Sequence, residues 1–137
     1  MSREVPYTEI RVGDTAELSK TITESDIQQF AGISMDFNPV HINEEFAKQT
    51  PFQGRIAHGM LTASLISAVI GTKLPGENTI YLGQTLNFTS PVYIGDTITA
   101  KVEVKEKKDK GKIALITTAF NQRGKTVLEG EATVKKD

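Results

Sequence analysis

The segment HGMLTASLISAVIGTKLPG, residues 58–76, limits the possible folds of this chain more than any other stretch. From Met60 to Ile70 every residue is apolar or small, so the segment has the length of a helix but no polar stripe. A helix on the surface of a globular protein shows such a stripe. We therefore expect a buried central helix that Gly71 stops and that Pro75 keeps from resuming.

Strand patterns dominate the chain after this segment. Residues 79–95, 96–108, 111–122 and 125–136 alternate polar with apolar residues or are rich in β-branched and aromatic ones. The turn-rich segments KKDKGK and NQRGK between them suit antiparallel hairpins. A further short strand is expected within residues 10–23. This order predicts an α+β domain in which one antiparallel sheet wraps around one long buried central helix.

A first short helix is expected over residues 23–34. Thr23 is a suitable N-cap with Asp26 three residues later, which is the spacing of a capping box. The apolar stripe of this helix consists of Ile27, Phe30 and Ala31.

The stretch DFNPVHI, residues 36–42, has no helical or strand period and contains an Asn-Pro pair, so we expect an irregular loop or turn. After it, residues 43–50 fit a second short helix capped by Asn43. Its first turn carries two glutamates, which a helix N-terminus favours.

Size and charge exclude several classes of protein. The 137 residues contain no visible linker or repeat, so residues 1–137 are expected to form a single domain. A formal net charge of −1 argues against a nucleic-acid partner or an anionic membrane surface. The first ten residues lack the apolar region of a signal peptide, and the apolar run is too short to span a bilayer. Together with the absence of cysteine, this favours a cytoplasmic location without membrane insertion.

The chain has two histidines, His41 and His58, and His is the side chain best suited to proton transfer near neutral pH. Asp36 precedes His41 by five residues with Pro39 between them, and a tight loop can aim both side chains into one cleft. A carboxylate beside an imidazole is the minimum needed for moving a proton to and from water. The alternative is an Asx-type turn in which Asp36 and Asn38 bond to local backbone. The spacing leaves both interpretations open.

Gly59 stands at the start of the expected buried helix. A helix N-terminus presents free N–H groups that stabilise a developing oxyanion, and glycine lets a substrate approach closely. The alternative is a simple tight turn, which is the commoner reason for a lone glycine at such a place. Within the helix, Ser67 either bonds to a catalytic side chain, since a buried hydroxyl needs a partner, or serves close packing as Ser64 does.

Other kinds of site find little support. Two histidines with scattered acids do not have the spacing of a metal site, so no metal is expected. The chain also lacks a glycine-rich dinucleotide or phosphate loop and a nucleophile elbow.

Two stretches together resemble the MaoC-like family: FAGISMDFNPVHINEEFA, residues 30–47, is similar to its hydratase-2 motif, and residues 55–71 resemble the segment that follows it. Residues 80–104 resemble the family's first long strands, and the likeness extends over residues 13–135. The resemblance is strongest to the short (R)-specific enoyl-CoA hydratases, which supply polyhydroxyalkanoate synthesis. The resemblance implies a hot-dog fold, in agreement with the expected order of elements. It also implies a homodimer that joins two sheets edge to edge, with two active sites near the interface.

The resemblance also assigns roles to individual residues. Asp36 and His41 match the catalytic dyad, and Asn38 matches the neighbouring polar residue. Gly59 matches the backbone N–H that polarises the thioester carbonyl. Ser67 falls where the family places a serine that supports the site.

The implied reaction is hydration of a trans-2-enoyl-CoA to the (R)-3-hydroxyacyl-CoA. Asp36 is expected to take a proton from water while His41 orients that water and assists protonation at carbon 2. Water and substrate supply every atom, so no cofactor is expected, and coenzyme A is part of the substrate. One position departs from the family: Met35 stands where the motif commonly has Gly, which would alter how the loop seats.

Three alternative functions remain open. They are dehydration of a carrier-protein thioester, thioester hydrolysis, and binding of acyl-CoA without catalysis. Carrier-protein dehydratases of this fold usually carry an acid on the central helix, and residues 61–70 contain none. The acyl tail is expected beside that helix, where bulky residues limit its depth or merely pack the core: Leu65, Val69 and Ile70.

Overall fold

The computed structural model describes residues 2–137, which form one curved antiparallel sheet packed on a long helix. The strands lie in the order β1-β4-β5-β6-β2, and β3 pairs with β6 beside β2. Their bounds are β1 (Thr15–Thr21), β2 (Ile80–Gln84), β3 (Asn87–Phe88), β4 (Thr97–Lys107), β5 (Lys112–Phe120) and β6 (Thr126–Lys135). The helices are α1 (Glu24–Ser34), α2 (Pro39–Ile42), α3 (Glu44–Ala47) and α4 (Gly59–Thr72), with short 3-10 turns at Tyr7–Glu9 and Asp109–Gly111.

The central strands follow the period of two that the sequence shows. In β4 every second side chain is fully buried, and these are Ile98, Ala100, Val102 and Val104. Antiparallel pairing fixes the register, with Val102 opposite Ala16 of β1 and Thr117 of β5. A shift by one residue would turn the apolar set away from the core, so this alternation specifies the register.

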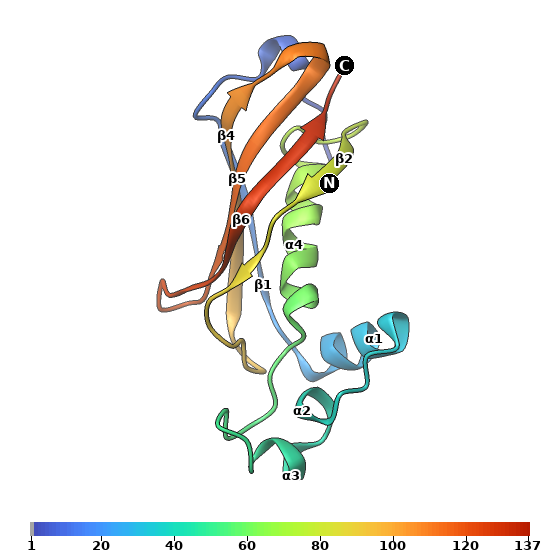
Figure 1. Ribbon diagram of the computed structural model, residues 1–137, viewed down its shortest axis with the longest axis vertical. Helices are drawn as coiled ribbons and strands as arrows, with labels where there is room; N and C mark the ends of the chain where they lie inside the picture. The colour runs from blue at the N-terminus through green and yellow to red at the C-terminus, as the bar shows by residue number, and fades with distance from the viewer. Residues whose placement is uncertain (1) are drawn as a thin grey trace.

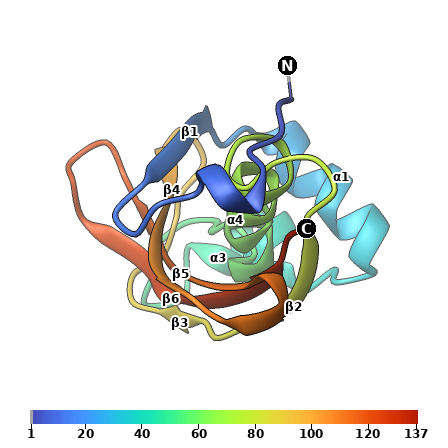
Figure 2. The same ribbon diagram turned by 90° about the horizontal axis from the view of Figure 1, so that it is seen from above.

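Helix α4 lies in the hollow of the sheet, as the view along the molecule shows (Figure 2). Its sheet-facing side is buried in the core cluster through Leu61, Leu65, Ile66, Val69 and Ile70. The predicted α+β architecture, a sheet around one long helix, is therefore correct. No helix within residues 2–137 is long and apolar enough to cross a membrane.

Two details of α4 differ from the expectation. The helix passes through Gly71 and ends after Thr72, where the N–H groups of Lys73 and Leu74 both donate to the Val69 carbonyl at 2.9 and 3.0 Å. Glycine alone does not stop a helix that is held by packing on both sides of it. The helix is also not buried on all faces, because the sheet covers one side and leaves an exposed stripe of Met60, Ser64, Ser67 and Gly71.

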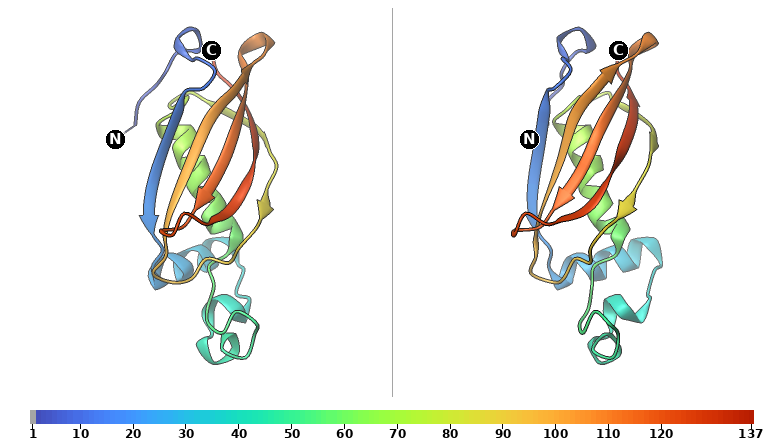
Figure 3. Two further views of the ribbon diagram at one scale, coloured as in Figure 1. Left: turned by 90° about the vertical axis from the view of Figure 1, so that its left-hand side faces the viewer. Right: turned by 60° about the vertical axis from the view of Figure 1, so that its left-hand side comes forward.

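Helices α1 to α3 lie together at one end of the sheet, beside the start of α4 (Figures 1 and 3). The predicted capping box of α1 is present: the Asp26 N–H donates to the Thr23 hydroxyl at 3.1 Å, and the Thr23 N–H donates to the Asp26 carboxylate at 2.9 Å. Ile27 and Ala31 are buried as expected. The same strong local signal that was visible in sequence therefore sets where α1 begins.

The prediction of an irregular loop over residues 36–42 was wrong for its second half. Residues Pro39–Ile42 form the short helix α2, because Asn38 accepts a hydrogen bond from the Val40 N–H at 3.2 Å and Pro39 occupies the first helical position. Asn43 then caps α3 as predicted, accepting from the Phe46 N–H at 3.0 Å.

Candidate active site

Asp36 lies in the turn between α1 and α2, with its side chain exposed. Its Oδ1 accepts the Asn38 N–H at 3.1 Å, and its own N–H donates to the Ser34 hydroxyl at 3.1 Å. The Asx-type turn considered from the sequence is therefore formed. It occupies one carboxylate oxygen with a local backbone donor and fixes the direction of the carboxylate, so the turn and a role in proton transfer are compatible.

His41 lies on α2 and is only 8% exposed. Its Nδ1–H donates to the Ile56 carbonyl oxygen at 2.7 Å, which leaves Nε2 with a lone pair. Burial lowers the pKa of His41 below its ordinary value of 6.5 and the nearby His58 adds to this effect, against the opposing influence of the Ile56 carbonyl and Asp36. The ring is thus held as a neutral hydrogen-bond acceptor at neutral pH.

Arg55 holds the backbone of His41. Its Nε–H donates to the His41 carbonyl oxygen at 2.7 Å, and its guanidinium pairs with the Glu24 carboxylate at 2.7 Å. Because Arg55 is only 8% exposed, it serves the scaffold of the site and is not an ordinary surface charge. Nothing nearby in the chain reveals its partner, because Glu24 of α1 lies 31 residues away.

The structure brings Asp36 and His41 together and adds His58. Polar side-chain atoms of these three residues lie within 4.8 Å of one another. Sequence reasoning noted His58 but gave it no part in the site, although its place directly before Gly59 was the available signal. A carboxylate and two imidazoles can also hold a divalent metal, with one nitrogen of each ring free, since the other contacts a backbone carbonyl.

Gly59 is the first residue of α4, and its N–H has no hydrogen-bond acceptor in the part of the chain that the structure describes. A free N–H at the start of a 14-residue helix is a donor for a negatively charged oxygen. A Cβ at this position would lie 2.7 Å from the Phe88 ring, so a larger residue would have to displace that ring or the start of α4. Gly59 does not have a positive φ, so the tight turn considered from the sequence is not what this position shows, and the oxyanion role stays a prediction.

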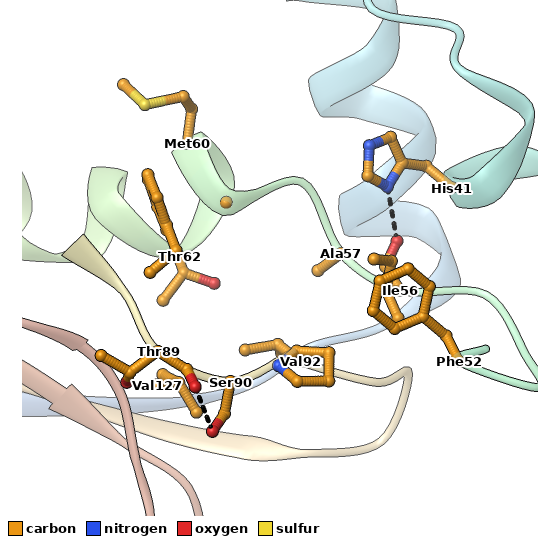
Figure 4. A pocket seen from close by; sticks show the side chains of 13 residues that line it. His41, Phe52, Ile56, Ala57, Met60, Thr62, Thr89, Ser90, Val92 and Val127 are labelled. Atoms are coloured by element: carbon orange, nitrogen blue, oxygen red, sulfur yellow. Dashed lines mark hydrogen bonds between the residues drawn. The ribbon is translucent and has the colours of Figure 1, made fainter. Parts of the chain in front are cut away.

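A cavity of about 500 Å³ lies between His41 and the start of α4 (Figure 4). His41 borders it on one side, and Met60 and Thr62 of α4 border it on the other. Gly59 also lines it. The rest of the wall is mostly apolar and comes from the loop before α4, β3 and the residues after it, and β6: Phe52, Ile56, Ala57, Phe88, Thr89, Ser90, Pro91, Val92 and Val127. Asp36 lies outside this wall, next to the His41 ring.

The residues expected to line an acyl pocket lie elsewhere in the described chain. Leu65, Val69 and Ile70 are buried in the core cluster and do not border the cavity. Ser67 is exposed on the open face of α4, and no hydrogen bond within residues 2–137 joins it to Asp36 or His41. The premise that Ser67 is a buried hydroxyl in need of a partner was wrong for the single chain, because the sheet does not cover that face.

Comparison with known proteins places the chain in a family. The family model for the MaoC like domain matches residues 9–125. An (R)-specific enoyl-CoA hydratase from Rhodospirillum rubrum is 53% identical over 128 residues, which cover 93% of this chain and 89% of the relative. The unliganded R-hydratase from Pseudomonas aeruginosa superposes with a TM-score of 0.94 at 50% identity, covering 97% of this chain and 86% of that one.

A relative of different substrate class also matches. The mitochondrial 3-hydroxyacyl-[acyl-carrier-protein] dehydratase from Arabidopsis thaliana is 37% identical over 128 residues, covering 90% of this chain and 76% of the relative. All three relatives span most of this chain, and the family model covers both the dyad turn and the start of α4. The chain therefore belongs to the MaoC-like domain family and has its hot-dog fold.

Proposed function

We propose that this protein is a hydro-lyase that adds water to trans-2-enoyl-CoA and yields (R)-3-hydroxyacyl-CoA, in a reversible reaction. The observation that carries the proposal is that His41 and the free N–H of Gly59 border one cavity, while the Asp36 carboxylate lies next to the His41 ring. The (R)-specific hydratases among the relatives support the same chemistry.

The geometry suggests how the reaction proceeds. The Gly59 N–H, at the positive end of α4, stabilises the enolate-like oxygen of the thioester. One such donor typically lowers the free energy of the transition state by ~3 kcal/mol. Polarisation of the carbonyl makes carbon 3 electrophilic. A water held between Asp36 and His41 gives its hydroxide to carbon 3, and the proton that it loses is returned to carbon 2. No residue changes its protonation state over the full cycle.

Within the dyad, we assign Asp36 as the base that accepts the proton of water. His41 orients the water through Nε2, and the proton that Asp36 accepts passes by way of this nitrogen to carbon 2. A neutral His41 suits this role, because a doubly protonated ring would have no lone pair for the water. Asn38 supports the arrangement by capping α2 and donating its N–H to Asp36.

We infer that the reaction uses no metal or redox cofactor, because water and substrate supply every atom transferred. The cluster of Asp36, His41 and His58 makes this worth testing directly. Dialysis against a strong chelator is expected to leave the rate of crotonyl-CoA hydration unchanged. A loss of activity that zinc or another divalent ion restores would overturn the inference.

The acyl carrier is coenzyme A in this proposal, and α4 carries no acidic residue of the kind that carrier-protein dehydratases usually place there. Because the Arabidopsis relative is a carrier-protein dehydratase, activity on CoA thioesters must be compared with activity on carrier-protein thioesters. The proposal is tested by measuring hydration rates on C4 to C12 enoyl-CoAs and on the matching carrier-protein thioesters. Chiral analysis identifies which isomer of the product forms. The proposal fails if carrier-protein thioesters are preferred or if the product is the (S) isomer.

We further propose that the protein is a cytoplasmic homodimer and that its product supplies polyhydroxyalkanoate synthesis. Support for a dimer comes from the edge strand β2, which exposes Ile80, Tyr81 and Leu82, and from the exposed stripe of α4 beside it. A second copy of the chain, joined edge to edge, would cover both surfaces. Ser67 lies in that stripe, so a supporting role for Ser67 is proposed only within the dimer.

A further inference from the structure

His58 has no role in the chemistry described above, yet it is placed between all three groups that carry it. It is only 2% exposed and is the N-cap residue of α4, directly before Gly59. It does not border the cavity. Any influence on the reaction must therefore pass through other residues.

The hydrogen bonds of His58 define its tautomer. Its Nε2 lies 2.9 Å from the Asp36 carbonyl oxygen, and since a carbonyl only accepts, Nε2 must carry a hydrogen. Its Nδ1 is buried without a partner among the described residues. A second hydrogen at Nδ1 would leave a buried donor unsatisfied, which is costly. The arrangement therefore fits the ring with hydrogen at Nε2 alone.

The His58 ring is held from two sides. The ring of His41 stacks on it with centroids 3.9 Å apart and planes 27° apart. The Phe30 ring of α1 lies against it at 4.9 Å with a tilt of 55°. The ring thus fills the space between α1 and α2 and supports the plane of His41.

We propose that His58 is a positioning residue of the dyad. Its Nε2–H fixes the backbone of Asp36, its ring supports His41, and its peptide link to Gly59 keeps both in register with the N–H that faces the thioester oxygen. One buried side chain thereby connects the water-activating groups to the oxyanion donor. This inference rests on the proposed hydratase function.

Two substitutions separate the hydrogen bond from simple filling of space. His58→Phe keeps an aromatic ring of similar size but removes the donor, whereas the amide N–H of Gln in His58→Gln takes the place of Nε2–H. We expect His58→Phe to lower kcat for crotonyl-CoA about 10- to 100-fold, the range that a small misplacement of reacting groups produces. KM should change less than about threefold, because His58 does not border the cavity. His58→Gln restores the donor but lacks the ring that stacks on His41, so it should recover only part of the lost kcat.

One kinetic outcome would overturn the proposal. It is a kcat of His58→Phe within about twofold of wild type, since displacement of the dyad is expected to cost far more. Circular dichroism and thermal unfolding of both variants establish that each is folded.

A measurement on the unmodified protein tests the geometry even if neither variant folds. The chain contains only two histidines, so long-range ¹H–¹⁵N correlation spectra resolve both rings. We expect His58 with hydrogen at Nε2 and His41 with hydrogen at Nδ1 at neutral pH. His58 with hydrogen at Nδ1 would overturn the proposal. Absence of hydratase activity in the wild type would instead refute the proposed function, while the spectra would still report the His58 contact.

Discussion

The chemistry of the site depends on how single residues are held by their local backbone. Asp36 gives one carboxylate oxygen to the Asn38 N–H, and His41 gives its Nδ1–H to the Ile56 carbonyl. Each contact leaves another oxygen or nitrogen of the same side chain available for water. Local hydrogen bonds of this kind orient catalytic groups without consuming them.

Burial of His41 predicts how the protein responds to pH. The pKa of His41 is lowered from 6.5 mainly by burial, so the folded protein resists protonation that the unfolded chain accepts. The stability that this group contributes is present above pH 6.5 and is lost as pH falls through its lower folded pKa. An NMR titration of the His41 ring should give a midpoint below 6.5. A midpoint at or above the ordinary value would contradict the described burial.

Met35 is the second residue with a testable local consequence. It ends α1 in the left-handed region, with φ 67°, where glycine has the lower conformational energy. Met35→Gly is expected to stabilise the protein by up to about 1 kcal/mol, since the relief of strain is partly offset by greater freedom of the unfolded chain. Urea unfolding of both proteins measures the difference. A loss of stability would show that the Met35 side chain contributes more than its backbone costs.

At the scale of elements, the signals that were local in sequence predicted the structure correctly. The Thr23 capping box and the Asn43 cap were recognised because each involves residues three apart. Helix α2 was missed because a single turn of helix, begun by Asn38 and Pro39, is too short to show a period. The passage of α4 through Gly71 was missed because tertiary packing overrides the weak preference of one glycine.

The site was also predictable only in part, because some of its contacts join residues that are far apart in the chain. Asp36, His41 and Gly59 stand in recognisable motifs. The part of His58 and the burial of Arg55 depend on contacts with Asp36 and Glu24, which lie 22 and 31 residues away in the chain. The cavity wall from β3 and β6 likewise has no signal within the motifs themselves.

The contact between α4 and β3 gives a prediction at this scale. Gly59→Ala places a Cβ 2.7 Å from the Phe88 ring, so the start of α4 or the ring must shift. We expect a loss of about 1–3 kcal/mol in the free energy of unfolding, as for other overpacked sites. The double variant with Phe88→Ala should lose less than the two single variants together, since the clash is gone. Strictly additive losses in denaturant unfolding would argue against the clash.

At the scale of the whole molecule, the sheet covers only one side of α4. The opposite side shows a stripe that begins at Met60 and ends at Gly71, and the neighbouring edge strand β2 exposes apolar side chains. An exposed edge strand with apolar residues favours pairing with another strand. The proposed dimer would complete both surfaces at once.

Charges on β2 should therefore disrupt the dimer. Ile80→Lys combined with Leu82→Lys is expected to convert a dimer to a monomer in size-exclusion chromatography with light scattering, because like charges oppose edge pairing. Val12→Lys is the matched control, since Val12 is also exposed but precedes β1 at the opposite edge of the sheet. A wild-type monomer would contradict the proposal outright. A dimer that survives the β2 charges would place the interface elsewhere.

The most direct test of the central claim is the hydration rate of crotonyl-CoA in variants of the dyad. Asp36→Asn and His41→Ala should each lower kcat by at least ~100-fold, the lower end for general acid–base catalysis, while the fold is retained. Asp109→Asn, in the exposed turn before β5, is the control and should leave kcat unchanged. If both dyad variants are folded and hydrate crotonyl-CoA at nearly the wild-type rate, Asp36 and His41 do not carry the reaction.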